Sequence, residues 1–222
     1  DLIVVHGDRV ETAAGALVGA LTNTRVAHVE GGEISGTVDE LLRHAVTKLS
    51  HIHLVCNEEA ASVLRQLGEV PETIHVIGSP DIDVMDSPNL PSLEAVLERY
   101  EVPFDRFGIL LMHPVTTEPE LVREHSIATV SAVLGCGLPF IVIYPNNDAG
   151  NHEILDAYRA FDEVSRIRLV PSMSFERFLT ALRHADVIVG NSSAGIREAP
   201  HYGVPAVNIG SRQNGRLRPA GV

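Results

Sequence analysis

Residues 28–51, HVEGGEISGTVDELLRHAVTKLSH, decide the fold class of this chain. The apolar stretch at 25–29 is typical of a short buried strand, a glycine-rich run follows it, and a helical pattern occupies 38 to about 50. Thr37 is expected to cap this helix, because Glu40 stands three residues later at the spacing of a capping box. A strand, a glycine-rich turn and a helix in this order predict one unit of a parallel α/β sheet.

Polar side chains gather where this strand ends and this helix begins. They are His28, Glu30, Asp39, Glu40, His44 and Lys48. The last three recur at i, i+4 and share one helical face. Ordinary explanations exist, because acids near a helix N-terminus favour its dipole and Asp39 can pair with Arg43 on the same helix. The gathering of so many polar groups at one place nevertheless favours a functional site.

Composition limits the class of protein. With 45% hydrophobic residues the 222-residue chain can bury a core, and no apolar run reaches the ~18 residues of a membrane span. The net charge of −12 argues against binding to nucleic acid or to anionic membranes. Cys56 and Cys136 form no CxxC pair and no secretory leader is visible, so a reduced cytoplasmic setting is expected.

The alternation of strand and helix extends outward from residues 28–51 over the whole chain. The expected strands are 2–5, 25–29, 52–56, 74–77, 107–112, 139–144, 167–170, 187–190 and 204–209. The expected helices are one that ends near residue 21 and those at 38–50, 57–68, 93–100, 119–134, 151–163, 174–185 and 193–202. The all-apolar run at 2–5 is typical of a strand buried on both faces. This alternation predicts parallel sheets covered by helices.

A change of composition divides the chain. Residues 79–105 are acidic and punctuated by prolines, with one short helix expected near 93–100. We therefore expect two Rossmann-like domains, a partial N-terminal domain at 1–80 and a C-terminal domain at 106–222. Residues 81–105 are interpreted as the interdomain connection.

Most of the unusual polar residues end or follow an expected strand. They are Asp8, Arg9, His28, Glu30, His113, Asn146, Asp148, Ser192, Ser193, Arg212 and Arg216. Open parallel sheets bind ligands outside the carboxyl ends of their strands, and random placement would put about half of these residues at the other end. The pattern predicts a ligand cleft between the two domains.

The segment GNSSAGIREA, residues 190–199, has the features of a diphosphate site. Hydroxyl groups and backbone N–H groups at the start of an expected helix favour an anion, and Gly195 permits close approach. Glu198 can accept hydrogen bonds from ribose hydroxyls, and Arg212 and Arg216 arrive from the next loop. The ordinary alternative is that Ser192 is only a helix cap. Neither a GxGxxG nor a Walker motif is present.

Several motifs together resemble a known family. They are HGDR, HVEGGEISGTVDELLRHAVTKLSH, HPVTTE, YPNNDAG, GNSSAGIREA and NIGSRQNGR. In this order and over the whole chain they resemble the hydrolysing UDP-N-acetylglucosamine 2-epimerases, whose product N-acetylmannosamine feeds sialic acid synthesis. The resemblance implies a GT-B-type pair of Rossmann-like domains, in a chain that lacks segments present at both ends of the family. It also implies release of UDP and inversion at carbon 2 through a 2-acetamidoglucal that is then hydrated.

The resemblance also implies roles for particular residues. Asp8, Glu30 and Asp39 match the catalytic acids of the family, and His113 matches an active-site histidine that can assist the leaving diphosphate. Ser192, Ser193, Glu198 and Arg212 match contacts to UDP. Arg9, His28, His44, Asn146, Asp148, Gly195 and Arg216 are expected to bind substrate. Which carboxylate is the base and which is the acid does not follow from the sequence.

The resemblance implies no metal and no redox cofactor. The expected partner is UDP-N-acetylglucosamine or a related UDP-sugar, with neither nucleic acid nor membrane, and the expected assembly is a homo-oligomer, dimer or tetramer. Which nucleotide-sugar is used does not follow from the sequence.

Other functions stay open. A metal-dependent hydrolase would use His6, Asp8, His28, Glu30 and His44 as ligands, but the further histidine and aspartate boxes of metallophosphoesterases are missing. A GT-B glycosyltransferase shares the serine and glutamate motif of the second domain, but has no need for three carboxylates in the first. A non-hydrolysing epimerase and a nucleotide-sugar sensor that binds UDP without turnover are further alternatives.

Overall fold

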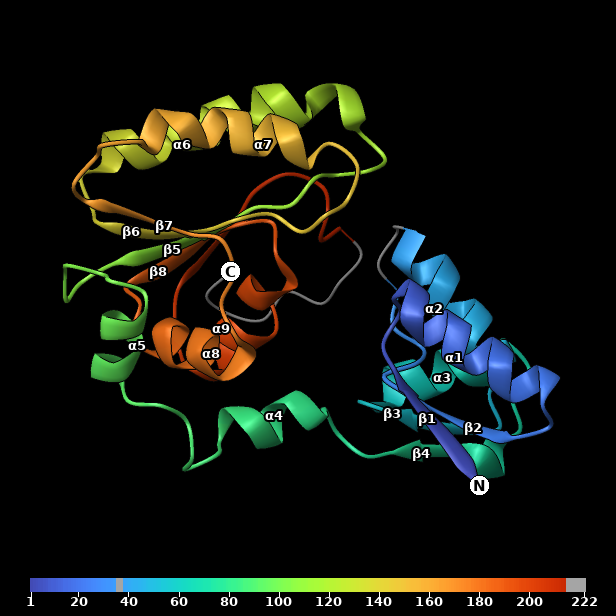
Figure 1. Ribbon diagram of the computed structural model, residues 1–222. Helices are drawn as coiled ribbons and strands as arrows, with labels where there is room; N and C mark the ends of the chain where they lie inside the picture. Colours follow the sequence, from blue (N-terminus) through green and yellow to red (C-terminus); the bar gives the residue numbers. More distant parts are fainter. Residues whose placement is uncertain (35–37, 215–222) are drawn as a thin grey trace. The chain divides into compact units, whose positions relative to one another are not determined.

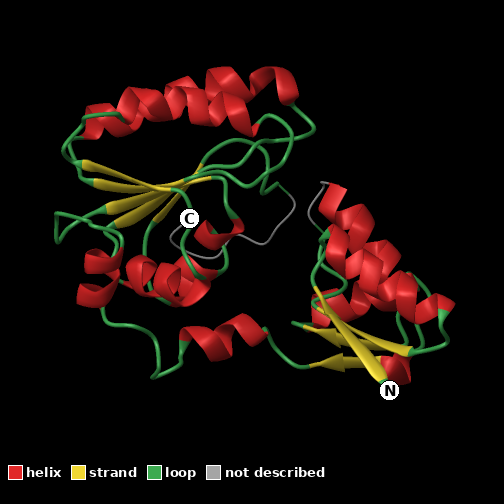
Figure 2. Cartoon of the chain, viewed as in Figure 1, coloured by secondary structure: helices red, strands yellow, loops and turns green. Residues whose placement is uncertain are grey.

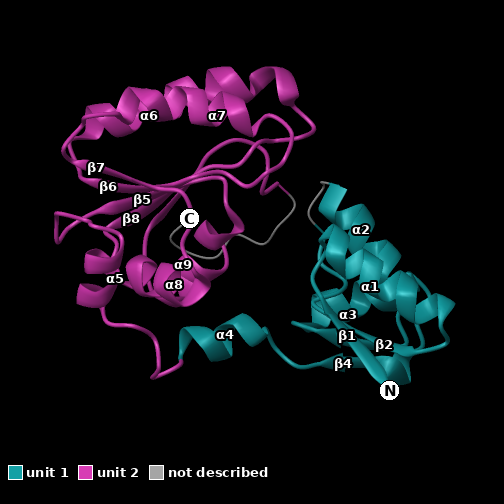
Figure 3. Ribbon diagram, viewed as in Figure 1, with its two compact units in different colours: residues 1–86 teal, residues 87–222 magenta. Residues whose placement is uncertain are grey.

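The chain folds into two compact units, Asp1–Asp86 and Ser87–Val222 (Figure 3). The computed structural model describes residues 1–34 and 38–214. Each unit contains one parallel sheet with helices packed against it (Figure 2), which confirms the α/β class. Thr37, the expected helix cap, lies outside the described residues. No helix in the described ranges combines the length and hydropathy needed to span a bilayer.

Unit 1, residues 1–86, has a four-stranded sheet in the order β1-β2-β3-β4. Its strands are β1 Leu2–His6, β2 Arg25–Val29, β3 Ile52–Val55 and β4 Ile74–Val76. Its helices are α1 Val10–Leu21, α2 Val38–Lys48, α3 Glu58–Gln66 and α4 Pro80–Met85, with a 3-10 turn at Pro71–Thr73. Because all strands are parallel, the residues that follow β1 and β2 lie at the same edge of the sheet.

The core of unit 1 lies between its sheet and its helices. Helices α1 and α2 lie side by side over the sheet (Figure 1). Ala16 and Val46 from these helices are buried together with Val5 and Val26 from the sheet. The expectation that strand 2–5 is buried on both faces is wrong. β1 is an edge strand in which Leu2 is 50% and Val4 60% exposed.

Unit 2, residues 87–222, has a five-stranded sheet in the order β7-β6-β5-β8-β9. Its strands are β5 Gly108–Leu111, β6 Phe140–Ile143, β7 Ile167–Val170, β8 Val187–Gly190 and β9 Ala206–Asn208. Its α-helices are α5 Leu93–Arg99, α6 Val122–Cys136, α7 Asn151–Tyr158, α8 Phe175–Arg183 and α9 Glu198–His201. Helices α6 and α7 cover one face of the sheet, and α5, α8 and α9 cover the other (Figure 1). Leu110, Phe140, Ile154 and Tyr158 are buried under the first pair.

Three helix predictions need correction. The helix expected at 193–202 is a 3-10 turn, η4 Ser193–Gly195, followed by the four-residue α9. The helices expected at 119–134 and 151–163 contain 3-10 turns at Pro119–Leu121 and Arg159–Phe161. Helix α4 is an element that the sequence did not predict, because acidic, proline-punctuated sequence indicates a connection between domains. Pro80 at its first turn is nevertheless a helix-start signal.

Gly190 allows β8 to end where it does. Its φ of +140° is a conformation that other residues rarely adopt, and an added Cβ would collide with the backbone of Leu111 on the neighbouring strand. β5 and β8 can therefore approach at their carboxyl ends only with glycine here.

We expect Gly190→Ala to lower the free energy of unfolding by more than about 2 kcal/mol, since it combines backbone strain with a backbone collision. Gly135→Ala in α6 is the matched control, because a Cβ there meets nothing within 4 Å and alanine favours the helix by about 0.5–1 kcal/mol. Urea unfolding of both variants measures the difference. Equal stabilities would contradict the strict need for glycine at 190.

Candidate functional site

The candidate site of unit 2 lies where the strand order reverses. The chain passes from β5 to β6 on one side and later adds β8 on the other side of β5. Loops after such neighbouring strands diverge at the carboxyl edge, and open parallel sheets bind ligands there. His113 lies in the loop after β5, and Asn191, Ser192 and Ser193 lie in the segment after β8.

Asn191 joins these two loops through its side chain. Its Oδ1 accepts a hydrogen bond from the His113 backbone N–H (2.7 Å), and its Nδ2 donates to the His113 carbonyl oxygen (2.8 Å). Its own carbonyl oxygen accepts from Arg212 Nη1 (3.2 Å) and Gln213 Nε2 (2.8 Å), which come from the segment after β9. Asn191 is only 1% exposed. It was not singled out from the sequence, although GNSS places it directly after a strand.

A backbone N–H group fixes the tautomer of the His113 imidazole. The Asn146 N–H donates to His113 Nδ1 over 3.1 Å, so the neutral ring carries its proton on Nε2. Asn146 Nδ2 in turn donates to Asp148 Oδ2 (2.5 Å), and the Asp148 N–H lies 3.4 Å from Asn146 Oδ1. The structure thus brings His113, Asn146 and Asp148 together and gives His113 a defined donor, Nε2–H.

The serine segment differs from the expected anion site. Ser192 Oγ accepts from the Ala194 N–H (3.3 Å), so the ordinary interpretation of Ser192 as a cap is correct for this hydroxyl. The N–H groups of Gly195, Ile196 and Arg197 donate to the carbonyls of Ser192 and Ser193. The backbone donors of 194–197 are therefore engaged within the turn, because the chain forms a 3-10 turn here rather than the start of one long helix.

The remaining residues of this motif have defined positions. Glu198 opens α9 and is 7% exposed. A Cβ on Gly195 would meet Ala206 Cβ at 3.6 Å, an ordinary contact, so packing alone does not require glycine. Arg216 lies outside the described residues. Of the two arginines expected to bind the diphosphate, Arg212 is the one within the described residues.

Two ion pairs connect α2 with the loop after β1. Arg43 Nη2 donates to Asp8 Oδ2, and Arg43 Nη1 donates to the Glu33 carbonyl oxygen (2.5 Å). Arg9 Nη1 lies 3.8 Å from Asp39 Oδ1. The Arg43 side chain is 2% exposed, so it anchors Asp8 from inside the unit. Asp8 and Asp39 thus each have an arginine that comes from the other segment, and the spacing along one helix did not reveal these pairs.

Glu30 is held in an uncommon conformation. Its φ is +63°, its backbone N–H donates to the Leu54 carbonyl oxygen (2.9 Å), and the residue is 7% exposed. Its Oε2 lies 3.2 Å from His6 Nε2, and its Oε1 accepts from Ser79 Oγ (2.9 Å). Positive φ at a residue other than glycine stores strain, which functional sites often carry. Ser79 lies 49 residues away, so no sequence pattern pointed to it.

His28 is part of the interior of unit 1. It is 0% exposed, and its Nε2 and Nδ1 lie 2.9 Å from the Gly7 carbonyl oxygen and 3.2 Å from Thr47 Oγ1. Burial lowers the pKa of His28 from 6.5 to about 4, with smaller contributions of the same sign from His53 and Arg43. The imidazole is neutral at ordinary pH and fastens the loop after β1 to α2. Its expected contact with substrate stays a prediction.

The helical face of α2 divides into two groups. His44 Nε2 lies 3.8 Å from Glu40 Oε1, as the i, i+4 spacing predicted. Lys48 was expected to join them, but its Nζ bonds Glu69 Oε1 (2.6 Å), whose Oε2 lies 3.2 Å from His53 Nε2. Lys48 therefore belongs to a separate network between α2 and the segment before β4.

The alternative of a metal site finds no support in the described residues. Within 1–34 and 38–214, no three or more His, Cys, Asp or Glu side chains are arranged to hold a metal ion. His6 faces Glu30, whereas Asp8 faces Arg43. These side chains form ion pairs with different partners.

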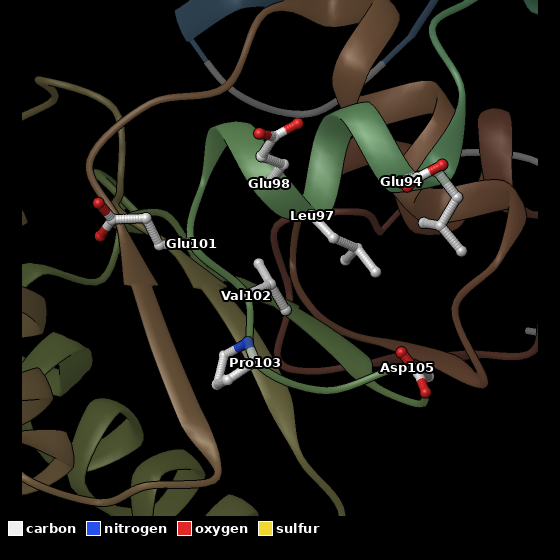
Figure 4. A pocket seen from close by; sticks show the side chains of 8 residues that line it. Glu94, Leu97, Glu98, Glu101, Val102, Pro103 and Asp105 are labelled. Carbon is white, nitrogen blue, oxygen red and sulfur yellow. The ribbon is translucent and has the colours of Figure 1, made fainter.

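A wide groove of about 710 Å³ lies elsewhere on unit 2, between α5 and the segment that leads to β5 (Figure 4). Its rim carries Glu94, Glu98, Glu101 and Asp105, and its floor is apolar. It lies before the amino end of β5, away from the carboxyl edge of the sheet. Four carboxylates repel an anion, so this groove is no candidate for a diphosphate.

Two α/β units, each with one parallel sheet, are the architecture of GT-B-like enzymes. The structure resembles that of UDP-GlcNAc 2-epimerase from Methanocaldococcus jannaschii in complex with UDP-GlcNAc and UDP. The TM-score is 0.74 at 23% identity, over 94% of this chain and 59% of that one. A sequence model of the family described as UDP-N-acetylglucosamine 2-epimerase matches residues 1–222, and the chain belongs to this family.

Relatives by sequence agree with this assignment. The chain is 52% identical to UDP-N-acetylglucosamine 2-epimerase of Neisseria meningitidis serogroup B, over 97% of this chain and 57% of the relative. It is 36% identical to UDP-N,N'-diacetylbacillosamine 2-epimerase (hydrolyzing) of Legionella pneumophila, over 98% of this chain and 58% of the relative. The chain thus spans somewhat more than half the length of these relatives.

We expect stability to fall as the pH is lowered from about 7.5 to about 5. The folded protein keeps His28 neutral until about pH 4, whereas the unfolded chain takes up the proton near 6.5, so acid favours unfolding. His28 alone accounts for a loss of about 2 kcal/mol over this range. Urea unfolding at the two pH values measures it.

His28→Gln should reduce this pH dependence, because glutamine keeps a donor and an acceptor but does not titrate. His75→Gln, at an exposed position of β4, is the matched control and should retain the wild-type difference. If His28→Gln lost as much stability in acid as the wild type, the buried neutral histidine would not be the cause.

Proposed function

We propose that the protein to which this chain belongs is a hydrolysing UDP-N-acetylglucosamine 2-epimerase that converts UDP-N-acetylglucosamine to UDP and N-acetylmannosamine. The observation that carries the proposal is the placement of the three carboxylates, Asp8, Glu30 and Asp39. All three belong to one edge of unit 1 and are held there by cations, a histidine and a hydroxyl group. Unit 2 supplies a separate set of groups suited to an anion.

Unit 2 is proposed to hold the UDP. Its anion-binding groups are the guanidinium of Arg212, the Nε2–H of His113 and the hydroxyls of Ser192 and Ser193, with Glu198 for the ribose. Charge-assisted hydrogen bonds from a guanidinium to phosphate are among the strong ones. Because the Asn146 N–H keeps the proton on Nε2, His113 can donate toward the oxygen that becomes negative when UDP leaves.

Unit 1 is proposed to carry out the proton transfers. A carboxylate removes the proton from carbon 2 while the bond from carbon 1 to the UDP oxygen breaks, which gives 2-acetamidoglucal. Water then adds at carbon 1 and a proton returns to carbon 2 from the opposite face, which gives N-acetylmannosamine. One carboxylate serves as the base, another as the acid, and a further one stabilises positive charge at carbon 1. The roles are not assigned among Asp8, Glu30 and Asp39.

The proposed reaction ends in hydrolysis rather than in return of UDP to the sugar. Support comes from the names of relatives, since the Legionella pneumophila relative is called hydrolyzing. A 32% identical relative from Escherichia coli is called polysialic acid biosynthesis protein P7, which supports a sialic acid context. A non-hydrolysing epimerase would instead return UDP to carbon 1. The substrate is proposed as UDP-N-acetylglucosamine from the name of the 52% identical relative, and a homo-oligomer is the proposed assembly.

Proton NMR of UDP-N-acetylglucosamine incubated with the protein in heavy water tests the proposal. A hydrolysing enzyme releases free UDP and N-acetylmannosamine with deuterium at carbon 2. A non-hydrolysing enzyme gives a mixture of UDP-sugars with deuterium at carbon 2. A sensor binds UDP and leaves the sugar unchanged, and this last result would contradict catalysis by the chain as tested.

We expect Arg212→Ala to weaken UDP binding by about 1.5–3 kcal/mol, the range for a lost hydrogen bond to a charged group. Isothermal titration calorimetry measures it. Arg106→Ala is the matched control, because Arg106 pairs with Asp186 at the amino ends of β5 and β8, away from the candidate site. Equal affinity of the Arg212 variant and the control would refute the placement of the diphosphate.

Asp8→Asn, Glu30→Gln and Asp39→Asn are expected to leave UDP affinity within about threefold but to reduce turnover of the complete protein at least ~100-fold, as for a lost acid or base. A variant that lacks only the hydration acid should release free 2-acetamidoglucal. A variant that lacks the elimination base should form neither glycal nor product and should not exchange the carbon 2 proton. Wild-type turnover in all three variants would leave these carboxylates with a purely structural role.

A further inference from the structure

Just beyond the end of β8, the side-chain amide of Asn191 makes the two hydrogen bonds that the backbone of a neighbouring strand would otherwise make. A planar amide carries one acceptor and one donor side, so it can pair with the N–H and the carbonyl of a single residue, as a neighbouring strand does. Asn191 makes both bonds to His113, at 2.7 and 2.8 Å. Aspartate, serine or alanine at this position cannot make both.

The backbone of Asn191 is fixed as firmly as its side chain. Its N–H donates to the Leu111 carbonyl oxygen (3.2 Å), which continues the pairing of β5 with β8. Its carbonyl oxygen receives Arg212 and Gln213 at 3.2 and 2.8 Å. A displacement of this one residue would therefore move the loop after β5 and the loop after β9 together.

We propose that Asn191 is the positioning residue of the nucleotide site. Its side chain sets the position of His113, and its carbonyl oxygen sets the position of Arg212. The side chains of His113 and Arg212 can then bind the same diphosphate. The identity of the ligand, a nucleoside diphosphate, rests on the proposed function. Positioning matters because a leaving group gains from two donors only when both are within hydrogen-bond reach of it at the same time.

The competing explanation is that Asn191 only satisfies buried backbone groups at the end of a strand. Such a residue would contribute to folding, but His113 and Arg212 would act independently of it. The two explanations differ in whether the His113 ring and the Arg212 contribution to UDP binding change when the amide is removed from a protein that remains folded.

The experiment uses Asn191→Ala and the nearly isosteric Asn191→Asp in the full chain. Aspartate keeps the acceptor for the His113 N–H but puts a carboxylate oxygen against the His113 carbonyl. Thr180→Val is the matched control in the same unit, because it removes a side-chain hydrogen bond to the Pro91 carbonyl oxygen (2.9 Å) from a residue of α8 that makes no bond to the described part of the site loops. If the alanine variant does not fold, the aspartate variant decides.

The first measurement is the imidazole nitrogen NMR signal of His113 without nucleotide, assigned with His113→Ala. In the wild type and in Thr180→Val it should show an unprotonated Nδ1 and a protonated Nε2. In the Asn191 variants the ring should sample both tautomers, because its distance from the Asn146 N–H is no longer fixed. An unchanged His113 signal in a folded Asn191 variant would overturn the proposal, whether or not UDP binds.

The second measurement is UDP affinity by calorimetry. Asn191→Ala should weaken binding about 10-fold, within the range for residues that act through others. The double variant with Arg212→Ala should be weaker by less than the product of the two single effects, because both act on one arginine. Multiplicative effects would overturn the coupling. If the wild type bound no UDP, the proposed function would fail, and the His113 signal alone would decide the role of Asn191.

Discussion

Buried polar groups at the carboxyl ends of parallel strands must find hydrogen-bond partners, and the candidate site depends on how this is achieved. A buried unpaired backbone group costs about 1–3 kcal/mol. In unit 2 the Asn191 side chain and backbone satisfy groups of two other loops at once, those after β5 and after β9. The close approach of β5 and β8 that makes this possible requires glycine at 190. The same bonds that complete the fold therefore place the residues proposed to bind the diphosphate.

In unit 1, polar groups at the carboxyl ends of the strands are paired mainly through charged side chains. The buried guanidinium of Arg43 pairs with Asp8 and bonds the Glu33 carbonyl, while neutral His28 bonds Gly7 and Thr47. Removing one partner from such a buried pair is more costly than never burying it. A carboxylate held in this way is already oriented when a substrate arrives, which is what general acid–base catalysis requires. Glu30, at positive φ, is held by residues from distant segments in the same manner.

The sequence predicted the fold well, because strand and helix depend on local patterns of apolar residues. It also placed the polar residues at strand ends, a consequence of parallel topology. Contacts between distant segments could not be predicted. The spacing along α2 did not predict that Arg43 bonds Asp8, or that Lys48 joins Glu69 outside the face it shares with His44. The exposure of β1 follows from its position at the sheet edge, which no local pattern shows.

The broken helix after β8 illustrates the same limit. Residues 193–202 have helical composition, but the 3-10 turn at Ser193–Gly195 engages its own N–H groups. A helix dipole therefore contributes less to an anion site here than a single long helix would. The side chains of His113 and Arg212, whose loops are bonded to Asn191, are the stronger candidates for contact with an anion. The turn forms through local bonds that composition does not reveal. The bonds that fix His113 and Arg212 join loops that are widely separated in the chain, so they could not be predicted from the sequence.

The central claim, that the carboxyl edge of the unit 2 sheet binds the diphosphate, is tested most directly by titrating the isotope-labelled chain with UDP and following its amide NMR signals. The largest shifts are expected at residues 111–113, 146–148, 190–193 and 208–213. Shifts that concentrate instead around the acidic groove at 93–105, or no shifts at millimolar UDP, would contradict it.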